Sequence, residues 1–207
     1  MPALPLQTDA FVLLKRPPAD KFQSFTVFSP EQGPLSVLQR VSTKPVATNA
    51  GGPLDLFDEA SLRLESSNQG RTWFAKEVRL ITRHPAIGRS YDALRHASAL
   101  AALVARNPVP AESRAPVAAL LRQAFAALAT PARPDFVWFK SLYRFARDEG
   151  YPIKEQWFPT LPAADRADVA TLLNRPLADQ TATPAAVERL TRRLEEYLRG
   201  HTEILIE

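Results

Sequence analysis

The sequence contains no cysteine, which excludes disulfide bonds, thiolate nucleophiles and zinc sites built on cysteine ligands. Glycine is scarce, with seven residues, and neither the GxGxxG nor the GxxxxGK pattern of phosphate-binding loops occurs. The three histidines, His84, His96 and His201, are far apart, so none has a partner at metal-ligand spacing. We therefore expect no metal and no cofactor.

Long apolar runs are also missing. No stretch of about 18 uncharged apolar residues, the minimum for a transmembrane helix, is present. The first residues, MPALPLQTDAF, lack the basic segment and the apolar segment of a secretory signal. These two absences predict a cytoplasmic protein.

No group of residues typical of catalysis stands out. The acidic pairs Asp58–Glu59 and Glu195–Glu196 are adjacent in sequence, and we expect them to be exposed, without the raised pKa that a general acid needs. We predict that the protein is not an enzyme. The alternative is a hydrolase or transferase with a dispersed site, which a pocket of convergent ionisable groups would support.

What is present divides the chain in two. The first part has the composition and turn spacing of short β-strands. Five strands of this size match a small closed antiparallel barrel, which leaves no exposed sheet edge. We predict this barrel over residues 1–82, with strands at Thr8–Arg16, Lys21–Ser29, Gly33–Val41, Leu54–Ser66 and Arg71–Ile81.

Beyond His84–Pro85 the apolar residues recur at helical spacing. Ser90 and Thr183 are predicted helix N-caps, and so is Asp135, while Gly150 is placed just past a helix end. We predict an all-α bundle over residues 83–207 and an α+β protein overall. The expected helices span 90–107, Arg114–Ala129, 135–149, Asp165–Asn174 and Pro184–Arg199.

The stretch from Phe136 to Phe158 combines aromatic and basic side chains. As a helix it places an apolar stripe, Trp138, Phe139, Leu142, Phe145 and Ala146, on one face, which we expect to be core. Its opposite face carries a basic ridge, Lys140, Arg144 and Arg147, beside Tyr143. The ridge either meets water or binds a carboxylate-rich peptide or a phosphate backbone.

Basic residues are also concentrated along the chain. The formal net charge is +4, and between Arg71 and Arg106 seven lysines and arginines stand against two acidic residues. Such a run is either a solvated face or a surface for an acidic partner.

Three segments resemble the bacterial RecO family of recombination mediators in DNA repair, here as a member without zinc. The opening AFVLLKRPPADKFQSFTVFSPEQGPLSVLQR is similar to that family's first strands, including the turn Ser29–Gly33. The junction from Glu77 to Leu103, with its Ala-rich helix, is also similar. WFKSLYRFARDEGYPIKEQW resembles a later family helix that ends in a Gly-Tyr-Pro stop.

The resemblance implies an N-terminal OB fold, a helical C-terminal domain and a non-enzymatic, nucleoid-associated role in DNA recombination after DNA damage. It implies binding of single- and double-stranded DNA and annealing of strands coated with single-stranded DNA-binding protein. RecR would be a partner in loading RecA.

An OB barrel binds strands through a basic groove and exposed aromatic residues. Phe22, Phe25 and Trp73 are the candidate stacking residues, and burial in the barrel core is the alternative for each of them. Our hypothesis for the basic ridge is that Lys140, Tyr143, Arg144 and Arg147 bind the acidic C-terminal tail of single-stranded DNA-binding protein. The candidate DNA-binding residues are Lys15, Arg16, Lys21, Arg40, Lys44, Arg71, Lys76 and Arg79.

A second hypothesis is a RecO-like protein-interaction adaptor with weak or no DNA binding. It is motivated by the loop after the third predicted strand, in which Lys44 is the one charged residue before Asp55. Such an adaptor would bind an acidic tail peptide and would not bind DNA.

Overall fold

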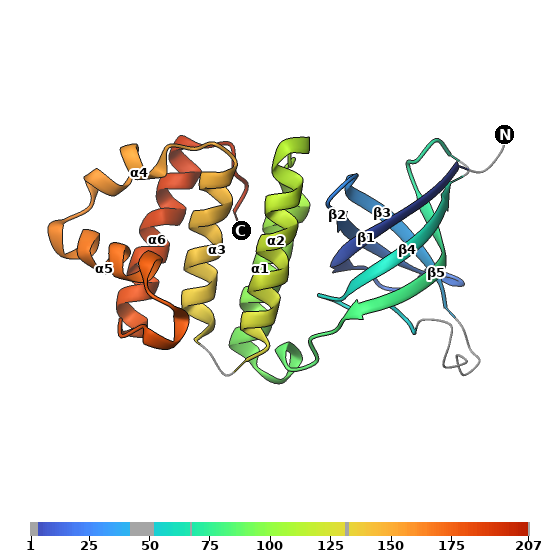
Figure 1. The fold of residues 1–207 in the computed structure, drawn as a ribbon, viewed down its shortest axis with the longest axis horizontal. Coiled ribbons are helices and arrows are strands. Elements are labelled where there is room, and N and C mark those ends of the chain that lie inside the picture. Colours follow the sequence, from blue (N-terminus) through green and yellow to red (C-terminus); the bar gives the residue numbers. More distant parts are fainter. Residues whose placement is uncertain (1–3, 42–51, 67, 131–132, 207) are drawn as a thin grey trace. The chain divides into compact units, whose positions relative to one another are not determined.

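The computed structural model describes residues 4–41, 52–66, 68–130 and 133–206, in which five β-strands precede six α-helices (Figure 1). The strands are β1 (Leu4–Lys15), β2 (Phe22–Ser29), β3 (Gly33–Arg40), β4 (Glu59–Ser66) and β5 (Trp73–Thr82). The helices are α1 (Tyr91–Arg106), α2 (Arg114–Leu128), α3 (Pro134–Asp148), α4 (Ile153–Gln156), α5 (Ala163–Asn174) and α6 (Pro184–His201). The predicted α+β class is confirmed.

The chain forms two compact units. The barrel unit comprises Met1–His84 and Val104–Ala119, and the helical unit comprises Pro85–Leu103 and Leu120–Glu207. The predicted domains, 1–82 and 83–207, stay a prediction. Among the described residues, no helix has both the length and the apolar character that a membrane span requires.

The five strands close into a barrel in the order β1-β2-β3-β5-β4. The neighbouring strands are antiparallel except β3 and β5, which run parallel and pair at Val37↔Trp73 and Leu38↔Phe74. The prediction of an entirely antiparallel barrel was wrong at this seam. A closed ring with an odd number of strands cannot alternate in direction throughout, so at least one neighbouring pair must run parallel.

The start of the fourth strand also differs from its prediction. We expected a strand from Leu54, but β4 begins at Glu59, because the backbone turns at Phe57, where φ is 67°. Leu54 still packs into the barrel core with 2% of its surface exposed. The alternating apolar pattern was therefore correct about burial and wrong about strand length.

The barrel core gathers the inward side chains of all five strands. Phe25, Val27, Val37, Leu62 and Leu64 lie in it, each with at most 1% of its surface exposed. Trp73 lies there too, at 6% exposed. These positions alternate along each strand, as the period of two requires when one face is buried.

Capping explains the helix ends. The Oγ atoms of Ser90 and Thr183 accept hydrogen bonds from the backbone N–H of Ala93 and Ala186, both at 3.3 Å, which confirms both predicted N-caps. Asp135 is not an N-cap, because α3 begins one residue earlier with Pro134, whose fixed φ suits the first helical position. Arg133 is the N-cap residue instead, and its side chain pairs with Asp135.

Helix α3 ends as predicted at Gly150, which has φ of +88°. The N–H of Gly150 donates to the carbonyl of Arg147 at 3.0 Å, and the N–H of Tyr151 donates to that of Ala146 at 3.1 Å. These two bonds define a Schellman motif, which needs the left-handed conformation that glycine adopts without steric cost.

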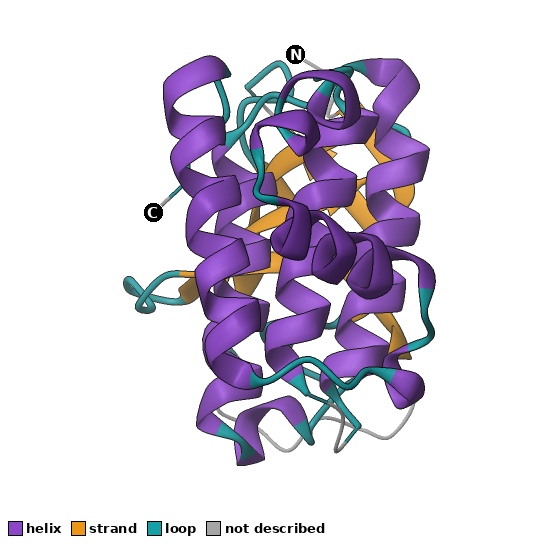
Figure 2. Ribbon diagram, turned by 90° about the vertical axis from the view of Figure 1, so that its left-hand side faces the viewer, coloured by secondary structure: helices purple, strands orange, loops and turns teal. Residues whose placement is uncertain are grey.

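The apolar stripe of α3 is core, as predicted. Phe139, Leu142, Phe145 and Ala146 are fully buried, and Trp138 is 8% exposed. Helix α3 packs beside α6, as Figure 1 shows, and Figure 2 shows long helices lying alongside one another. The burial of one face of α3 leaves Lys140, Arg144 and Arg147 on the other.

Candidate functional site

A groove of about 1200 Å³ opens in the barrel unit; we call it the barrel groove. Strands β3 and β5 pair at only two positions, and residues that follow this pairing, Gln39 and Arg40 on β3 and Ala75 to Leu80 on β5, line the groove. Its described lining residues include five cationic side chains and one carboxylate: Lys15, Arg40, Arg63, Lys76, Arg79 and Glu77.

Three of these cations are ion-paired. The Lys15 Nζ lies 3.0 Å from Asp55 Oδ1, and Lys76 Nζ lies 3.1 Å from Glu65 Oε2. Arg63 pairs with Glu77. Within the described part of the chain, Arg40 and Arg79 make no ion pair, so their charges face solvent.

The pKa of the Asp55 carboxyl is set by burial on one side and by hydrogen bonds and nearby cations on the other. Burial acts to raise the pKa of its carboxyl, but the hydrogen bonds from Lys15 and from the Leu56 N–H, with the charges of Lys15 and Arg83, hold this pKa below its ordinary value. Asp55 is therefore ionised at neutral pH and neutralises part of the charge of Lys15.

The barrel groove brings together half of the predicted DNA-binding residues. Lys15, Arg40, Lys76 and Arg79 line it. Arg16 and Lys21 are exposed on the β1–β2 connection and Arg71 on the β4–β5 connection, and none of the three lines the groove. Lys44 lies outside the described residues.

The predicted stacking residues are not equivalent. Phe25 and Trp73 are 1% and 6% exposed and belong to the barrel core, so neither offers a ring face to a ligand. Phe22 is half-buried and meets Phe74 edge to face, with ring centroids 5.6 Å apart. Sequence reasoning missed Phe74, since its partner is 52 positions away on a strand that is not its sequence neighbour.

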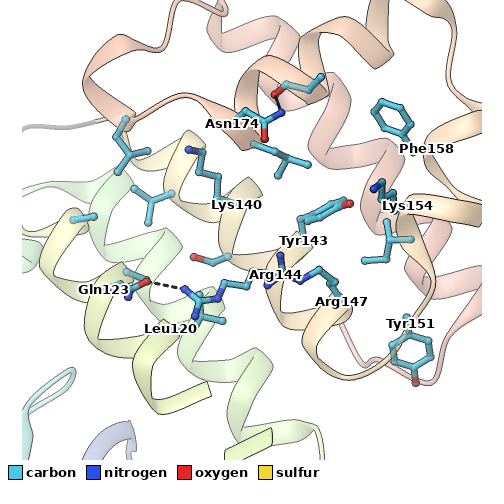
Figure 3. A pocket seen from close by; sticks show the side chains of 18 of the residues that line it. Leu120, Gln123, Lys140, Tyr143, Arg144, Arg147, Tyr151, Lys154, Phe158 and Asn174 are labelled. Carbon is cyan, nitrogen blue, oxygen red and sulfur yellow. Dashed lines mark hydrogen bonds between the residues drawn. The ribbon is translucent and has the colours of Figure 1, made fainter. Parts of the chain in front are cut away.

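A second groove, of about 770 Å³, lies within the helical unit; we call it the helical groove. Residues of α2, α3, α4 and α5 line it (Figure 3). All four predicted partner-binding residues, Lys140, Tyr143, Arg144 and Arg147, are among them. Its apolar lining includes Leu120, Ala124, Val137, Leu173 and Leu177.

Two of the lining residues that were not predicted add to the charge and the aromatic character of the helical groove. Lys154 on α4 adds a fourth cation, and Phe158 adds an aromatic side chain (Figure 3). Glu155 is the one carboxylate among the described lining residues. A cationic rim beside apolar side chains suits a ligand that is both anionic and apolar.

Intramolecular contacts hold the cations of the helical groove in place. Arg144 donates from Nη1 to Gln123 Oε1 at 2.7 Å and from Nε to Asp148 Oδ2 at 3.3 Å. Arg147 donates two hydrogen bonds to Asp148 Oδ1, at 2.8 and 2.6 Å. Because these side chains are already ordered, a ligand would lose little side-chain entropy on binding them.

Lys140 is half-buried and Tyr143 is 8% exposed. The Lys140 ammonium donates to the carbonyl of Arg175 at 2.5 Å, and burial lowers the pKa of this lysine. Burial raises the pKa of the Tyr143 phenol, while the charge of Arg147 opposes the rise and that of Glu155 adds to it. Tyr143 is therefore a neutral hydrogen-bonding group in this groove at physiological pH.

Ionisable groups do converge in the helical groove, which is the arrangement that a dispersed catalytic site would require. Ser141 is the one hydroxyl-bearing Ser or Thr among its described lining residues, and no hydrogen bond joins Ser141 to a histidine, lysine or carboxylate there. A nucleophile needs such a base within hydrogen-bond reach. Among the described lining residues, Ser141 thus has no such base.

No group of three or more metal-ligating side chains occurs in the described ranges. His96 is largely buried, and its Nδ1 lies 2.7 Å from the carbonyl of Asp92. Burial lowers the pKa of His96, so its ring is mainly neutral at pH 7.

No protein-family model matches this chain, and no curated protein does. The fold and the grooves define an α+β protein in which a closed five-stranded barrel precedes a helical bundle, with a cation-lined groove in each unit.

Proposed function

We propose that this protein is a non-enzymatic recombination mediator of the RecO type in DNA repair. In this proposal the barrel is an OB fold that binds single- and double-stranded DNA. The protein anneals strands coated with single-stranded DNA-binding protein and, with RecR, assists the loading of RecA. The observation that carries the proposal is that Lys15, Arg40, Lys76 and Arg79, from three strands, line one groove.

The barrel topology supports this proposal. Small five-stranded barrels of the OB type bind oligonucleotides on the face of their second and third strands and on adjacent loops. Arg40 lies at the end of β3, and Arg16, Lys21 and Arg71 lie on the connections next to this face. A DNA strand that extends beyond the barrel groove would therefore contact further cationic side chains.

The unpaired charges of Arg40 and Arg79 are the strongest phosphate-binding candidates. Lys15, Arg63 and Lys76 would have to exchange a carboxylate partner for a phosphate. Binding that neutralises phosphates releases counterions, so the logarithm of the affinity falls with the logarithm of salt by about 0.7 for each charge on a single strand.

A salt titration tests the proposal. Binding of a single-stranded oligonucleotide is measured by mobility shift between about 50 and 200 mM salt, where phosphate contacts weaken binding steeply. A variant with Arg166→Gln and Arg192→Gln, two exposed arginines outside both grooves, is the control and should bind as the wild type does. Absence of binding at 50 mM salt, or a flat response to salt, contradicts the proposal.

The helical groove is assigned to the acidic C-terminal tail of single-stranded DNA-binding protein. The support is that all four residues predicted for this tail line one groove, with an apolar lining next to them. This assignment of the helical groove can be tested in a strand-annealing assay. Annealing of coated strands should need the helical groove, whereas annealing of bare strands should not.

The adaptor with weak or no DNA binding is a second candidate. It is favoured by the ion pairs of Lys15, Arg63 and Lys76, which already neutralise three of the five barrel-groove cations. Calorimetry with a synthetic acidic tail peptide, beside the oligonucleotide titration, separates the two candidates. Binding of the peptide without binding of DNA would support the adaptor.

A further inference from the structure

The ring pair Phe22–Phe74 lies on the outer face of the barrel. Phe25 and Val37 are register partners that point into the core. Because side chains alternate along a strand, the next pair, Ser24 and Leu38, points outward. The pair Phe22 and Arg40, two positions further on, points outward as well. Trp73 also points inward and pairs with Val37, which places the next residue, Phe74, on the outer face opposite Leu38.

The two rings approach each other across β3, because β3 lies between β2 and β5 in the sheet. Their centroids are 5.6 Å apart and their planes are inclined by 73°, the edge-to-face arrangement that aromatic pairs prefer. Both residues are half-buried, so each ring is fixed by its surroundings while part of it faces solvent. The pair is thus an ordered aromatic surface on the sheet.

Cations lie beside this pair on the Phe22 side. Arg40 is the register partner of Phe22, and Lys21 precedes Phe22 and is exposed. On the other side Lys76 reaches Glu65, and Glu65 is the register partner of Phe74. The Phe22 side of the aromatic surface is therefore flanked by the cations Lys21 and Arg40, whereas the Phe74 side carries the Lys76–Glu65 ion pair. Cations next to aromatic rings match a DNA strand whose phosphates alternate with unpaired bases.

The barrel groove itself has no such surface. Phe25 is the one aromatic residue among its described lining residues, and it is buried. Arg40 belongs both to the groove lining and to the surroundings of Phe22. A single DNA strand bound by Arg40 would thus have its sugar-phosphate backbone in the barrel groove and its bases beside the ring pair.

We propose that Phe22 and Phe74 form a stacking surface for unpaired bases, which makes the barrel prefer single-stranded over double-stranded DNA. The inference rests on the proposed DNA-binding function of the barrel. A base in a duplex is already stacked and gives its faces to its neighbours, so a protein ring adds little to it. An unpaired base gains a stacking partner.

The test compares two oligonucleotides of the same length, one normal and one abasic throughout its central part. Phe22→Leu and Phe74→Leu keep the apolar volume and remove the rings. Each should weaken binding of the normal strand about tenfold and leave binding of the abasic strand unchanged, since stacking needs a base. Phe74→Tyr keeps a ring and should bind as the wild type does. Ile81→Ala, at an exposed residue of β5 outside the groove, is the control.

The possible results are distinct. Loss with the normal strand alone, restored in Phe74→Tyr, supports the stacking surface. If the Leu variants lose the same affinity for both oligonucleotides, or lose none for either, the stacking surface is overturned. DNA binding by the barrel is not contradicted by that result. If the wild type binds neither strand at low salt, both the proposed DNA binding and the stacking surface are overturned.

Discussion

The two grooves assemble their cations in different ways. In the helical groove, Lys140, Arg144 and Arg147 come from one helix at spacings of four and three residues, which share a helix face. In the barrel groove, Lys15, Arg40 and Arg79 come from three strands that lie far apart in sequence. The first arrangement follows from local geometry, and the second exists only once the barrel has closed.

The same difference appears in the charge balance. In the helical groove, Asp148 receives hydrogen bonds from both Arg144 and Arg147 and lies on the same helix. In the barrel groove, carboxylates from other segments neutralise Lys15 and Lys76, while Arg40 and Arg79 stay unpaired among the described residues. We therefore expect the helical groove to be the more ordered site and the barrel groove the more sensitive to salt.

The largest effect is expected from the core that supports the helical groove. Phe139→Ala removes a fully buried ring from α3 and should lower the free energy of unfolding by about 3–5 kcal/mol. Urea unfolding followed by far-UV circular dichroism measures this change. Tyr91→Ala, at a residue 79% exposed, is the control and should change stability by less than about 0.5 kcal/mol. A loss below 1 kcal/mol for Phe139→Ala would contradict the assignment of the stripe to core (~1 kcal/mol is a typical single-mutation effect).

The next effect separates the grooves by their ligands. Arg144→Glu with Arg147→Glu should weaken binding of an acidic peptide about 100-fold, because two charge-assisted hydrogen bonds become repulsive contacts. DNA binding by the barrel should stay unchanged. Calorimetry with the peptide is the measurement, and Arg166→Glu with Arg192→Glu is the matched charge reversal outside the groove. An equal loss of peptide affinity in both double variants would mean that the net charge of the protein, and not the helical groove, governs peptide binding.

A smaller effect is expected in the barrel groove. Arg40→Gln with Arg79→Gln should reduce the salt slope of single-strand binding by about 1.4, since each removed contact accounts for about 0.7. Arg16→Gln with Arg71→Gln, on the connections and outside the groove, is the comparison. If this second pair changes the slope more, DNA lies mainly on the connections. Peptide binding should be the same in both.

The smallest effect concerns the end of α3. Gly150→Ala should destabilise the protein by about 1 kcal/mol, because Gly150 has φ of +88° and an added Cβ would strain the backbone. Apart from Gly150 itself and the two adjoining residues, no atom lies within 4 Å of that Cβ, so the cost is conformational. Gly200→Ala, within α6 and equally open, should stabilise by about 0.5–1 kcal/mol. Changes of the same sign in both variants would argue against the left-handed helix end.

The sequence predicted local features well. The N-caps Ser90 and Thr183, the stop at Gly150 and the buried stripe of α3 all depend on residues within a few positions of one another. The grouping of Lys140, Tyr143, Arg144 and Arg147 in one groove has the same origin. Lys154 and Phe158 were missed because they follow Pro152, in short segments that have too few turns to show a periodic pattern.

Features that depend on closure of the barrel were predicted less well. The alternating pattern marks strands but does not say which strands pair, so the parallel contact of β3 with β5 was not seen. The same pattern cannot tell which aromatic residue points inward, and two of the three stacking candidates, Phe25 and Trp73, are core. The prediction of Asp135 as an N-cap was wrong because Pro134, which precedes it, already occupies the first helical position.

The aromatic contact at the end of α3 gives the helical groove an optical property. The ring of Tyr143, which lines the groove, lies 6.4 Å from the ring of Trp157, which is 2% exposed. At this separation light absorbed by the phenol can pass to the indole, whose emission then depends on what contacts Tyr143. Occupation of the groove should thus change the tyrosine-excited part of the intrinsic tryptophan emission, to which Trp157 contributes together with Trp73 and Trp138.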